Sequence, residues 1–293
     1  MTKIMFHCNW GCSSGELLNT YKIHTPQESG VWNNIQATTN VLEADYHVIM
    51  DGGIPNNVPL NKVIYFQREE PEIKAPKLDW PDDLFFQGTF TDRKHHFVPT
   101  WRVIKSYDFL KNLEYNRDDK KHMVSSITSG KFVARGHKAR VNFLATLVEH
   151  TKDIDIFGAH GIENFGNISS CFKGKLEYNS YCKFEGLYPY HYSLAFENSS
   201  CYNCVSEKPV DALLTWTMPI YWGCPNVSDY LPEGSYHHIK DIDDFKSIEQ
   251  VIEIIKTPPT EENILAMAKA RELILDKYNI WSEIETIIDE AKK

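Results

Sequence analysis

The sequence lacks a long hydrophobic run, and no stretch approaches the roughly 18 consecutive apolar residues of a membrane-spanning helix. It also lacks an excess of basic residues: 31 Lys and Arg face 40 Asp and Glu in 293 residues, a formal net charge of −9. That charge disfavours a general nucleic-acid-binding protein, which normally presents a basic face. The first residues, MTKIMFHCNWGC, lack the apolar core of a signal peptide, so we expect a cytosolic protein.

Cysteine is scarce and odd in number. The seven cysteines are Cys8, Cys12, Cys171, Cys182, Cys201, Cys204 and Cys224. Cys201 and Cys204 form one CxxC motif, but no second CxxC or His pair follows at the spacing of a zinc site. In a reducing cytosol all seven are expected to be free thiols, and no metal is predicted.

Common nucleotide-binding and hydrolase motifs are absent as well. No GxGxxG follows a predicted strand, and neither GxxxxGK[ST], GxSxG nor HExxH occurs. The adjacent pairs Asp82-Asp83 and Asp243-Asp244 are typical of solvated surface rather than of metal sites. The sequence therefore gives no sign of a nicotinamide, flavin, P-loop, serine-hydrolase or zinc-protease site.

What the sequence does contain is an ordinary globular composition, 42% hydrophobic and 24% charged, in a chain long enough for two domains. Short apolar runs ending at turn residues alternate with helical segments, which favours an α/β fold with parallel sheets. Strands are predicted at 3–8, 45–50, 62–67, 153–157, 192–196 and 218–222, with a short one inside 124–134. Helices are predicted at 29–43, 138–150, 206–214, 260–278 and 280–292.

A polar and charged segment at 111–123 predicts the domain boundary. We expect domains at 1–120 and 121–270, and a C-terminal helix at 271–293 that packs back across the cleft between two Rossmann-like domains. Ligands of such sheets bind beyond the carboxyl ends of the strands. Residues directly after predicted strands are therefore candidates: Glu69, Glu70, Gly158, Glu197, Asn198 and Gly223.

The densest pattern lies between residues 188 and 236. Phe196-Glu197-Asn198 is followed by Val205-Ser206-Glu207-Lys208, by Asp211-Ala212 and by Pro219-Ile220-Tyr221-Trp222-Gly223. In their order and spacing these short motifs resemble the donor-binding signature of the family 10 glycosyltransferases, the α1,3-fucosyltransferases. Upstream, the similarity is weaker: 155–158 resembles a strand end of the family, Arg140 lies where the family has a donor-binding arginine, and 65–71 resembles a strand ending in Glu-Ser-Pro.

The resemblance implies a GT-B-like fold, with an acceptor-binding domain at 1–120 and a donor-binding domain at 121–270. It implies an inverting, metal-independent enzyme that moves L-fucose from GDP-fucose to a hydroxyl of a glycan, with no cofactor. Neither an anchor nor a stem is evident, which is typical of a short soluble member from a bacterium or virus. Nucleic acid and membrane are not expected partners.

The residues suit that chemistry. Without a metal, cations must neutralise the departing pyrophosphate, and we expect Arg140 and Lys208, each at a helix start, to do so. Glu207 should face a sugar or ribose hydroxyl, and Asn198 should contact donor oxygens. Gly158, Glu197 and Ser206 complete the predicted donor-binding set, although Glu197 also suits a purely structural cap. The resemblance of 65–71 to the family's strand ending in Glu-Ser-Pro implies that Glu69 is the general base, with Glu70 as the alternative.

Several alternatives stay open at this point. Arg135 and Lys138 compete with Arg140, and His95, His96 and His191 are either acceptor contacts or ordinary histidines. Phe196, Tyr221 and Trp222 are expected to be core. Cys204 stands where family members commonly have Tyr, so the donor could instead be another nucleotide sugar such as a UDP-pentose. The protein could also be a non-catalytic module that binds a sugar or nucleotide.

Overall fold

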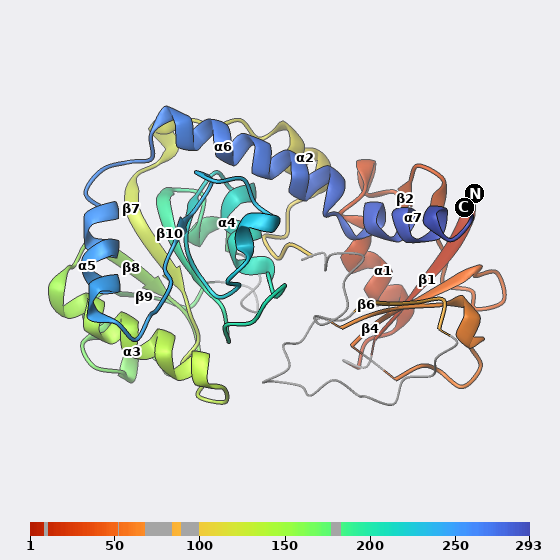
Figure 1. The fold of residues 1–293 in the computed structure, drawn as a ribbon, viewed down its shortest axis with the longest axis horizontal. Coiled ribbons are helices and arrows are strands. Elements are labelled where there is room, and N and C mark those ends of the chain that lie inside the picture. The colour runs from red at the N-terminus through yellow and green to blue at the C-terminus, as the bar shows by residue number, and fades with distance from the viewer. Residues whose placement is uncertain (9–10, 52, 68–83, 89–99, 177–182) are drawn as a thin grey trace. The chain divides into compact units, whose positions relative to one another are not determined.

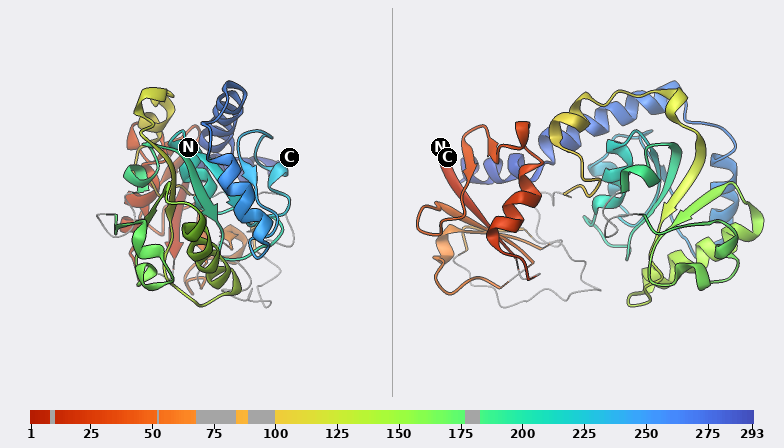
Figure 2. Two further views of the ribbon diagram at one scale, coloured as in Figure 1. Left: turned by 90° about the vertical axis from the view of Figure 1, so that its left-hand side faces the viewer. Right: turned by 180° about the vertical axis from the view of Figure 1, so that it is seen from behind.

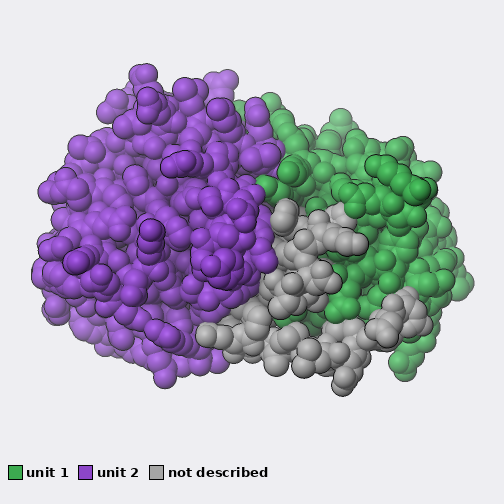
Figure 3. Space-filling view, viewed as in Figure 1, with its two compact units in different colours: residues 1–99, 105–112, 275–293 green, residues 100–104, 113–274 purple. Residues whose placement is uncertain are grey.

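The computed structural model describes residues 1–8, 11–51, 53–67, 84–88, 100–176 and 183–293. The chain divides into two compact units, which Figure 3 colours separately. Unit 1 comprises Met1–Pro99, Lys105–Asn112 and Leu275–Lys293, and unit 2 comprises Thr100–Ile104 and Leu113–Ile274. The C-terminal residues therefore belong with the N-terminal ones.

The sheet of unit 1 has six strands within the described residues, in the order β2-β3-β1-β4-β5-β6. Its strands are β1 (Thr2–Cys8), β2 (Val31–Trp32), β3 (Ile35–Ala37), β4 (Tyr46–Met50), β5 (Val63–Phe66) and β6 (Phe86–Gly88). Only the β2–β3 pair is antiparallel among these. The predicted strands at 3–8, 45–50 and 62–67 are confirmed.

The predicted helix at 29–43 is wrong. This segment forms the β2–β3 hairpin, whose turn residue Asn33 has a left-handed φ of 46°. Asparagine tolerates that conformation, and the hairpin takes precedence over the apolar spacing of Val31 and Ile35. The helix of this region is instead α1 (Ser14–Lys22), where Ser13 and Glu16 form a reciprocal capping box.

The C-terminal helix α7 (Ile280–Glu290) completes the core of unit 1. Its Trp281 is fully buried, meets the Phe6 ring edge-on at 5.4 Å, and donates its indole N–H to the Tyr21 carbonyl at 2.9 Å. Helix α1 packs on β1, as the rear view in Figure 2 shows, and α2 (Tyr107–Asn112) is the third helix of this unit among the described residues.

The sheet of unit 2 is parallel throughout its described strands, in the order β12-β11-β10-β7-β8-β9. Its strands are β7 (His122–Ile127), β8 (Ile154–Phe157), β9 (Phe172–Gly174), β10 (Tyr190–Phe196), β11 (Met218–Trp222) and β12 (His237–His238). The strands predicted at 153–157, 192–196 and 218–222 and within 124–134 are confirmed. Four helix predictions are also confirmed, by α3 (Arg135–His150), by α4 (Glu207–Leu214), by α6 (Glu261–Glu272) with its π-helical extension Leu273–Lys277, and by α7 of unit 1.

Helices cover both faces of this sheet (Figure 1). Right-handed crossovers place α3 (Arg135–His150), which follows β7, and α4, which follows β10, on opposite faces. Helix α5 (Phe245–Ile254) packs with α3, and α6 packs with α4. Short 3₁₀ turns occur at Pro26–Glu28, Leu60–Lys62, Arg117–Asp119, Ile162–Asn164, Ile168–Ser170, Lys183–Gly186 and Val227–Asp229.

The strand order of unit 2 reverses between β7 and β10, because the chain continues to β8 on one side and to β11 on the other. At such a switch point the two outgoing loops diverge and leave a crevice at the carboxyl ends of the strands. This is the place where the fold offers a ligand site. Separately, no helix in the described part of the chain is long and apolar enough to cross a membrane.

Candidate functional site

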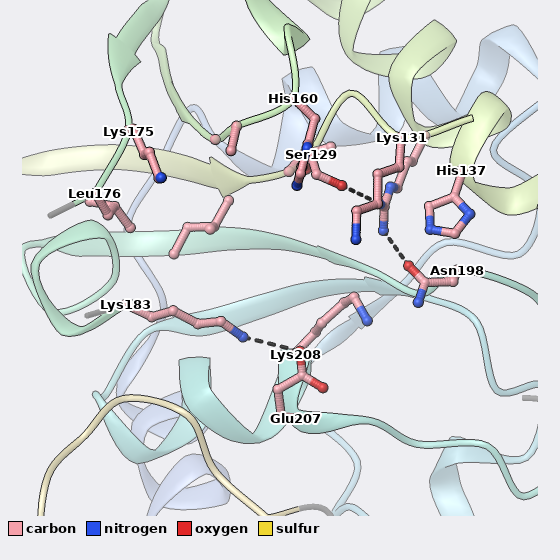
Figure 4. A pocket seen from close by; sticks show the side chains of 15 residues that line it. Ser129, Lys131, His137, His160, Lys175, Leu176, Lys183, Asn198, Glu207 and Lys208 are labelled. Atoms are coloured by element: carbon pink, nitrogen blue, oxygen red, sulfur yellow. Dashed lines mark hydrogen bonds and ion pairs between the residues drawn. The ribbon is translucent and has the colours of Figure 1, made fainter. Parts of the chain in front are cut away.

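A cavity of about 430 Å³ lies at the switch point of unit 2 (Figure 4). Its walls come from the segments after β7, β8, β9 and β10, from the 3₁₀ turn Lys183–Gly186, from the first two turns of α3 and from the first turn of α4. The lining residues are Ile127, Thr128, Ser129, Lys131, His137, Arg140, Gly158, Ala159, His160, Lys175, Leu176, Lys183, Asn198, Glu207 and Lys208.

Arg140 joins the two loops that diverge at the switch point. Its Nη1 donates to Asn198 Oδ1 at 2.6 Å, and its Nη2 donates to Ser129 Oγ at 3.2 Å. Ser129 follows β7 and Asn198 follows β10, so the guanidinium connects both strand ends, and Arg140 as a whole is 5% exposed. One prediction needs correction here: α3 begins at Arg135, so Arg140 lies in its second turn and not at its start.

Lys208 is held from behind by Glu197. The Lys208 Nζ lies 2.9 Å from Glu197 Oε2 and donates to Ser206 Oγ at 3.1 Å. Glu197 is fully buried and also accepts from the Ser206 N–H at 2.9 Å and from the Tyr221 hydroxyl at 3.3 Å. Ser206 is the N-cap of α4, accepting from the Lys208 N–H. Glu197 therefore fixes both the helix start and the side chain of Lys208.

A second buried ion-pair group stands beside the first. Lys183 Nζ lies 3.1 Å from Glu207 Oε1 and 2.9 Å from Asp211 Oδ2, and Arg102 N–H donates to Asp211 Oδ1 at 2.6 Å. Burial opposes the charge on Glu207, but Lys183, Lys208 and Arg102 outweigh it and hold the pKa of Glu207 well below its usual range. Glu207 is thus a carboxylate and an acceptor for hydroxyl groups at neutral pH.

His137 enters the cavity as a neutral ring. Burial, together with Arg140, Lys208 and Lys131, lowers its pKa to about 4. Its Nδ1 accepts the Ala134 backbone N–H at 3.0 Å, which leaves the ring proton on Nε2. His137 therefore presents one N–H donor to a ligand and is not a proton source near pH 7.

Two glycines allow the loops to approach this closely. A Cβ on Gly158 would lie 1.8 Å from the Thr128 carbonyl oxygen, and a Cβ on Gly136 would lie 2.1 Å from the Asn198 carbonyl oxygen. A side chain at Gly158 would push the end of β8 away from that of β7, and one at Gly136 would push the start of α3 away from Asn198.

The site is cationic overall. Among the described lining residues, Lys131, Arg140, Lys175, Lys183 and Lys208 are cations, whereas Glu207 is the one carboxylate. Glu197 and Asp211 lie behind the wall, so three carboxylates face five cations and a net charge of about +2 is left for a ligand. In the described ranges no group of three or more His, Cys, Asp or Glu is placed to hold a metal.

The loop between Asn198 and Ser206 contradicts one prediction. Cys201 and Cys204 form a disulfide with a Cα–Cα distance of 5.6 Å, so they are not free thiols. The free-thiol prediction rested on the cytosolic compartment and not on geometry; the turn through Asn203 (φ 62°) brings the two Cα atoms within the range that a disulfide needs. Cys171 and Cys224 are free, as predicted.

The structure brings together most of the predicted donor-binding residues. Arg140, Gly158, Asn198, Glu207 and Lys208 line the cavity, while Glu197 and Ser206 stand behind Lys208. Glu69, Glu70, His95 and His96 lie outside the described residues. Of the remaining candidates, Arg135 and Lys138 do not line the cavity, and His191 is buried within β10. Phe196 and Tyr221 are core, as predicted.

Sequence reasoning missed seven polar residues of the wall: Thr128, Ser129, Lys131, His137, His160, Lys175 and Lys183. Ser129, His160 and Lys175 each follow a strand directly or within three residues, so the strand-end rule could have found them. Lys183 carried no such signal, because its partners Glu207 and Asp211 are distant in sequence.

Residues 117–264, half of the chain, match the model of "Glycosyltransferase family 10 (fucosyltransferase) C-term". The chain belongs to glycosyltransferase family 10. Within the chain, the matched region contains the whole cavity wall. The fold agrees with a crystal structure of an α1,3-fucosyltransferase, at a TM-score of 0.50 and 18% identity over 98% of this chain and 90% of that one.

Curated relatives of this family 10 chain match in part. An α1,3-fucosyltransferase of Helicobacter pylori is 38% identical over 92 residues, which cover 31% of this chain and 18% of that protein. The GDP-fucose protein O-fucosyltransferase 3 of Rattus norvegicus is 22% identical over 175 residues, 58% of this chain and 36% of its own length. The chain thus matches about a fifth to a third of these relatives' lengths.

Proposed function

We propose that this protein transfers L-fucose from GDP-fucose to a hydroxyl group of a glycan. The observation that carries the proposal is the convergence of Arg140 and Lys208 on one cationic cavity at the switch point of unit 2. Membership of family 10 and the names of the matched relatives, which are fucosyltransferases, support the choice of donor. Glycan is the acceptor class that we propose for unit 1.

The cavity suits a diphosphate leaving group. The diphosphate of a nucleotide sugar gains negative charge as the sugar leaves, so fixed cations stabilise the transition state more than the bound donor. Arg140 can offer a fork of N–H groups, and Lys208 adds a point charge at the N-terminus of α4, where the helix dipole also favours an anion. The Nε2–H of His137 supplies a neutral donor beside them.

The Glu207 carboxylate is suited to accept hydrogen bonds from hydroxyl groups of the donor's ribose or sugar. Because Lys183 neutralises much of its charge, Glu207 can stand in a site for an anion without repelling it. Lys183 is a positioning residue in this scheme, since it holds Glu207 and Asp211 together on the first two turns of α4.

We propose an inverting reaction, in which a carboxylate takes the proton of the acceptor hydroxyl as that oxygen attacks the anomeric carbon opposite the diphosphate. Glu69 is the proposed base and Glu70 the alternative. We further propose that no metal is needed, because the cations of the cavity can carry the charge that a metal would otherwise neutralise. Full activity in excess EDTA would support this, and loss of activity restored by Mg²⁺ or Mn²⁺ would contradict it. A cytosolic location stays a prediction, testable by fractionation.

The test is GDP release from GDP-fucose in the presence of a panel of glycan acceptors. The Lys208→Met variant should lose well over tenfold in kcat/KM, about 2–4 kcal/mol by comparison with other lost transition-state donors. Lys246→Met, which removes an exposed lysine outside the cavity, is the matched control and should leave turnover unchanged. Equal activity of the two variants would overturn the role of Lys208.

Glu69→Gln separates an enzyme from a binding module. For an enzyme with this base, the variant should bind GDP like the wild type and release none from GDP-fucose. A wild type that binds GDP but shows no turnover with any acceptor would favour the binding module instead, and turnover with UDP-sugars in place of GDP-fucose would change the donor.

A further inference from the structure

The Cys201–Cys204 disulfide lies in the eight-residue connection between two walls of the cavity. Asn198, the partner of Arg140, lies three residues before Cys201, and Ser206, the N-cap of α4, lies two residues after Cys204. Any change in the path of this connection therefore acts on both Asn198 and the α4 N-terminus.

Hydrogen bonds extend from the disulfide to Lys208. The Tyr221 hydroxyl lies 3.4 Å from the Cys204 carbonyl and 3.3 Å from Glu197 Oε1, and the other Glu197 oxygen holds Ser206 Oγ at 2.5 Å and Lys208 Nζ at 2.9 Å. The fully buried Tyr221 also accepts the Cys224 N–H at 3.0 Å. The backbone of Cys204 and the charge of Lys208 are thus joined through two buried side chains.

Part of the loop is held independently of the disulfide. Asn203 Oδ1 accepts from Asn226 Nδ2 at 2.9 Å and from the Tyr230 hydroxyl at 2.7 Å, and the Asn203 N–H donates to Asn226 Oδ1. Asn203 has a left-handed φ of 62°, a conformation that needs such support. These contacts would keep the centre of the loop in place after reduction but would leave the Cys201 and Cys204 side chains released.

A small reductant can reach the disulfide at Cys201, whereas Cys204 is buried, and the Cys224 thiol competes poorly for exchange. Tyr202, between the two cysteines, is 66% exposed, and Cys201 is partly exposed. The buried Cys224 thiol donates to Asn226 Oδ1 at 3.1 Å, and burial raises its pKa, so it stays protonated and attacks the disulfide poorly. A two-electron change at Cys201 and Cys204 alone is the chemistry that this loop allows.

We propose that Cys201 and Cys204 are a redox modification site that tunes nucleotide binding in the adjacent cavity, with the disulfide form binding more tightly. A dithiol attacks the disulfide, forms a mixed disulfide with one cysteine, and leaves as a cyclic disulfide; two electrons and two protons end on the Cys201 and Cys204 thiols. This inference rests on the proposed donor site in unit 2.

The size of the effect follows from chain entropy. Opening so short a loop returns freedom equivalent to at most about thirtyfold in an equilibrium constant. Since the Asn203 contacts retain part of the order, we expect the Kd for GDP to rise by roughly three- to tenfold on reduction.

The experiment is calorimetric titration of GDP into the full-length protein, before and after treatment with dithiothreitol, with thiols counted in each state. The Cys201→Ser/Cys204→Ser double variant should bind like the reduced wild type and should not respond to dithiothreitol. Cys171→Ser is the matched control: Cys171 is a buried free cysteine outside the cavity, so this variant should keep the full response.

Equal GDP affinity in the disulfide and dithiol states would overturn the redox inference and leave the donor site intact. A response that persists in the double variant would also overturn it, because another cysteine would then be responsible. Absence of GDP binding in both states would instead contradict the proposed function.

Discussion

Replacing the buried carboxylate of Glu197 by an amide tests the internal support of the site. In Glu197→Gln the new Nε2–H₂ group faces either Lys208 Nζ or the Ser206 N–H, so a donor meets a donor in a fully buried place. Breaking a buried pair by removing one charge costs about 3–5 kcal/mol. For a unit of this size, each kcal/mol lowers Tm by roughly 2–4 °C, so the expected loss is about 6–20 °C.

Thermal unfolding followed by circular dichroism measures this loss. Asp243→Asn is the matched control, because its ion pair with Arg135 is exposed and worth little; a shift below about 2 °C is expected there. Saturating GDP should recover part of the Glu197→Gln loss, since a phosphate would give Lys208 a new anionic partner. A Glu197→Gln protein whose Tm lies within about 2 °C of the wild type would refute the reasoning.

Three further predictions concern the rest of the chain. Burial, with nearby cations, lowers the pKa of His137 and His191 to about 4, below the unfolded value of 6.5, so stability present above pH 6.5 should be lost as the pH falls toward 4; a flat Tm from pH 7 to 4.5 would contradict this. Arg271 stacks on Trp216 at 4.3 Å and donates to the carbonyls of Leu213, Leu214 and Leu113. The substitution Arg271→Lys should therefore lower the free energy of unfolding, measured by urea titration, by about 2–3 kcal/mol. Arg135→Lys, at an exposed position, should leave it unchanged. Trp281→Ala should lower the free energy of unfolding by about 3–5 kcal/mol, whereas Leu42→Ala, at a residue that is 92% exposed, should lower it by less than about 0.5 kcal/mol. Similar losses in the two variants would contradict the role of α7 in the core.

The sheets were largely predictable because buried parallel strands leave continuous apolar runs, such as 45–50 and 192–196, that end at turn residues. The β2–β3 hairpin was not predictable, because strands of two and three residues are too short to show an alternating pattern, and the apolar residues of this segment have the spacing of a helix. Ser13 and Glu16 have the spacing of a capping box, a pattern from which the start of α1 could have been predicted. A C-terminal helix that packs back on the chain is expected from the sequence, but its contact through Trp281 and Phe6 depends on tertiary packing, which no local pattern contains.

The site residues that were predicted are those that follow a strand or belong to the motifs between Phe196 and Lys208. Lys183 was not, because a lysine becomes a site residue only when the fold brings Glu207 and Asp211 to it. The disulfide was missed for a different reason: spacing alone cannot give the turn at Asn203 that brings Cys201 and Cys204 together. Glu69 and Glu70 remain predictions from sequence.

The central claim is that the cavity of unit 2 binds the diphosphate of GDP-fucose. Calorimetric titration of the wild type with GDP, GDP-fucose and UDP, repeated with Arg140→Ala, tests it most directly. The account predicts that both guanosine ligands bind more tightly than UDP, and that Arg140→Ala weakens GDP binding by at least tenfold, about 1.4 kcal/mol. Equal binding of GDP and UDP, or GDP binding unchanged in Arg140→Ala, would contradict it.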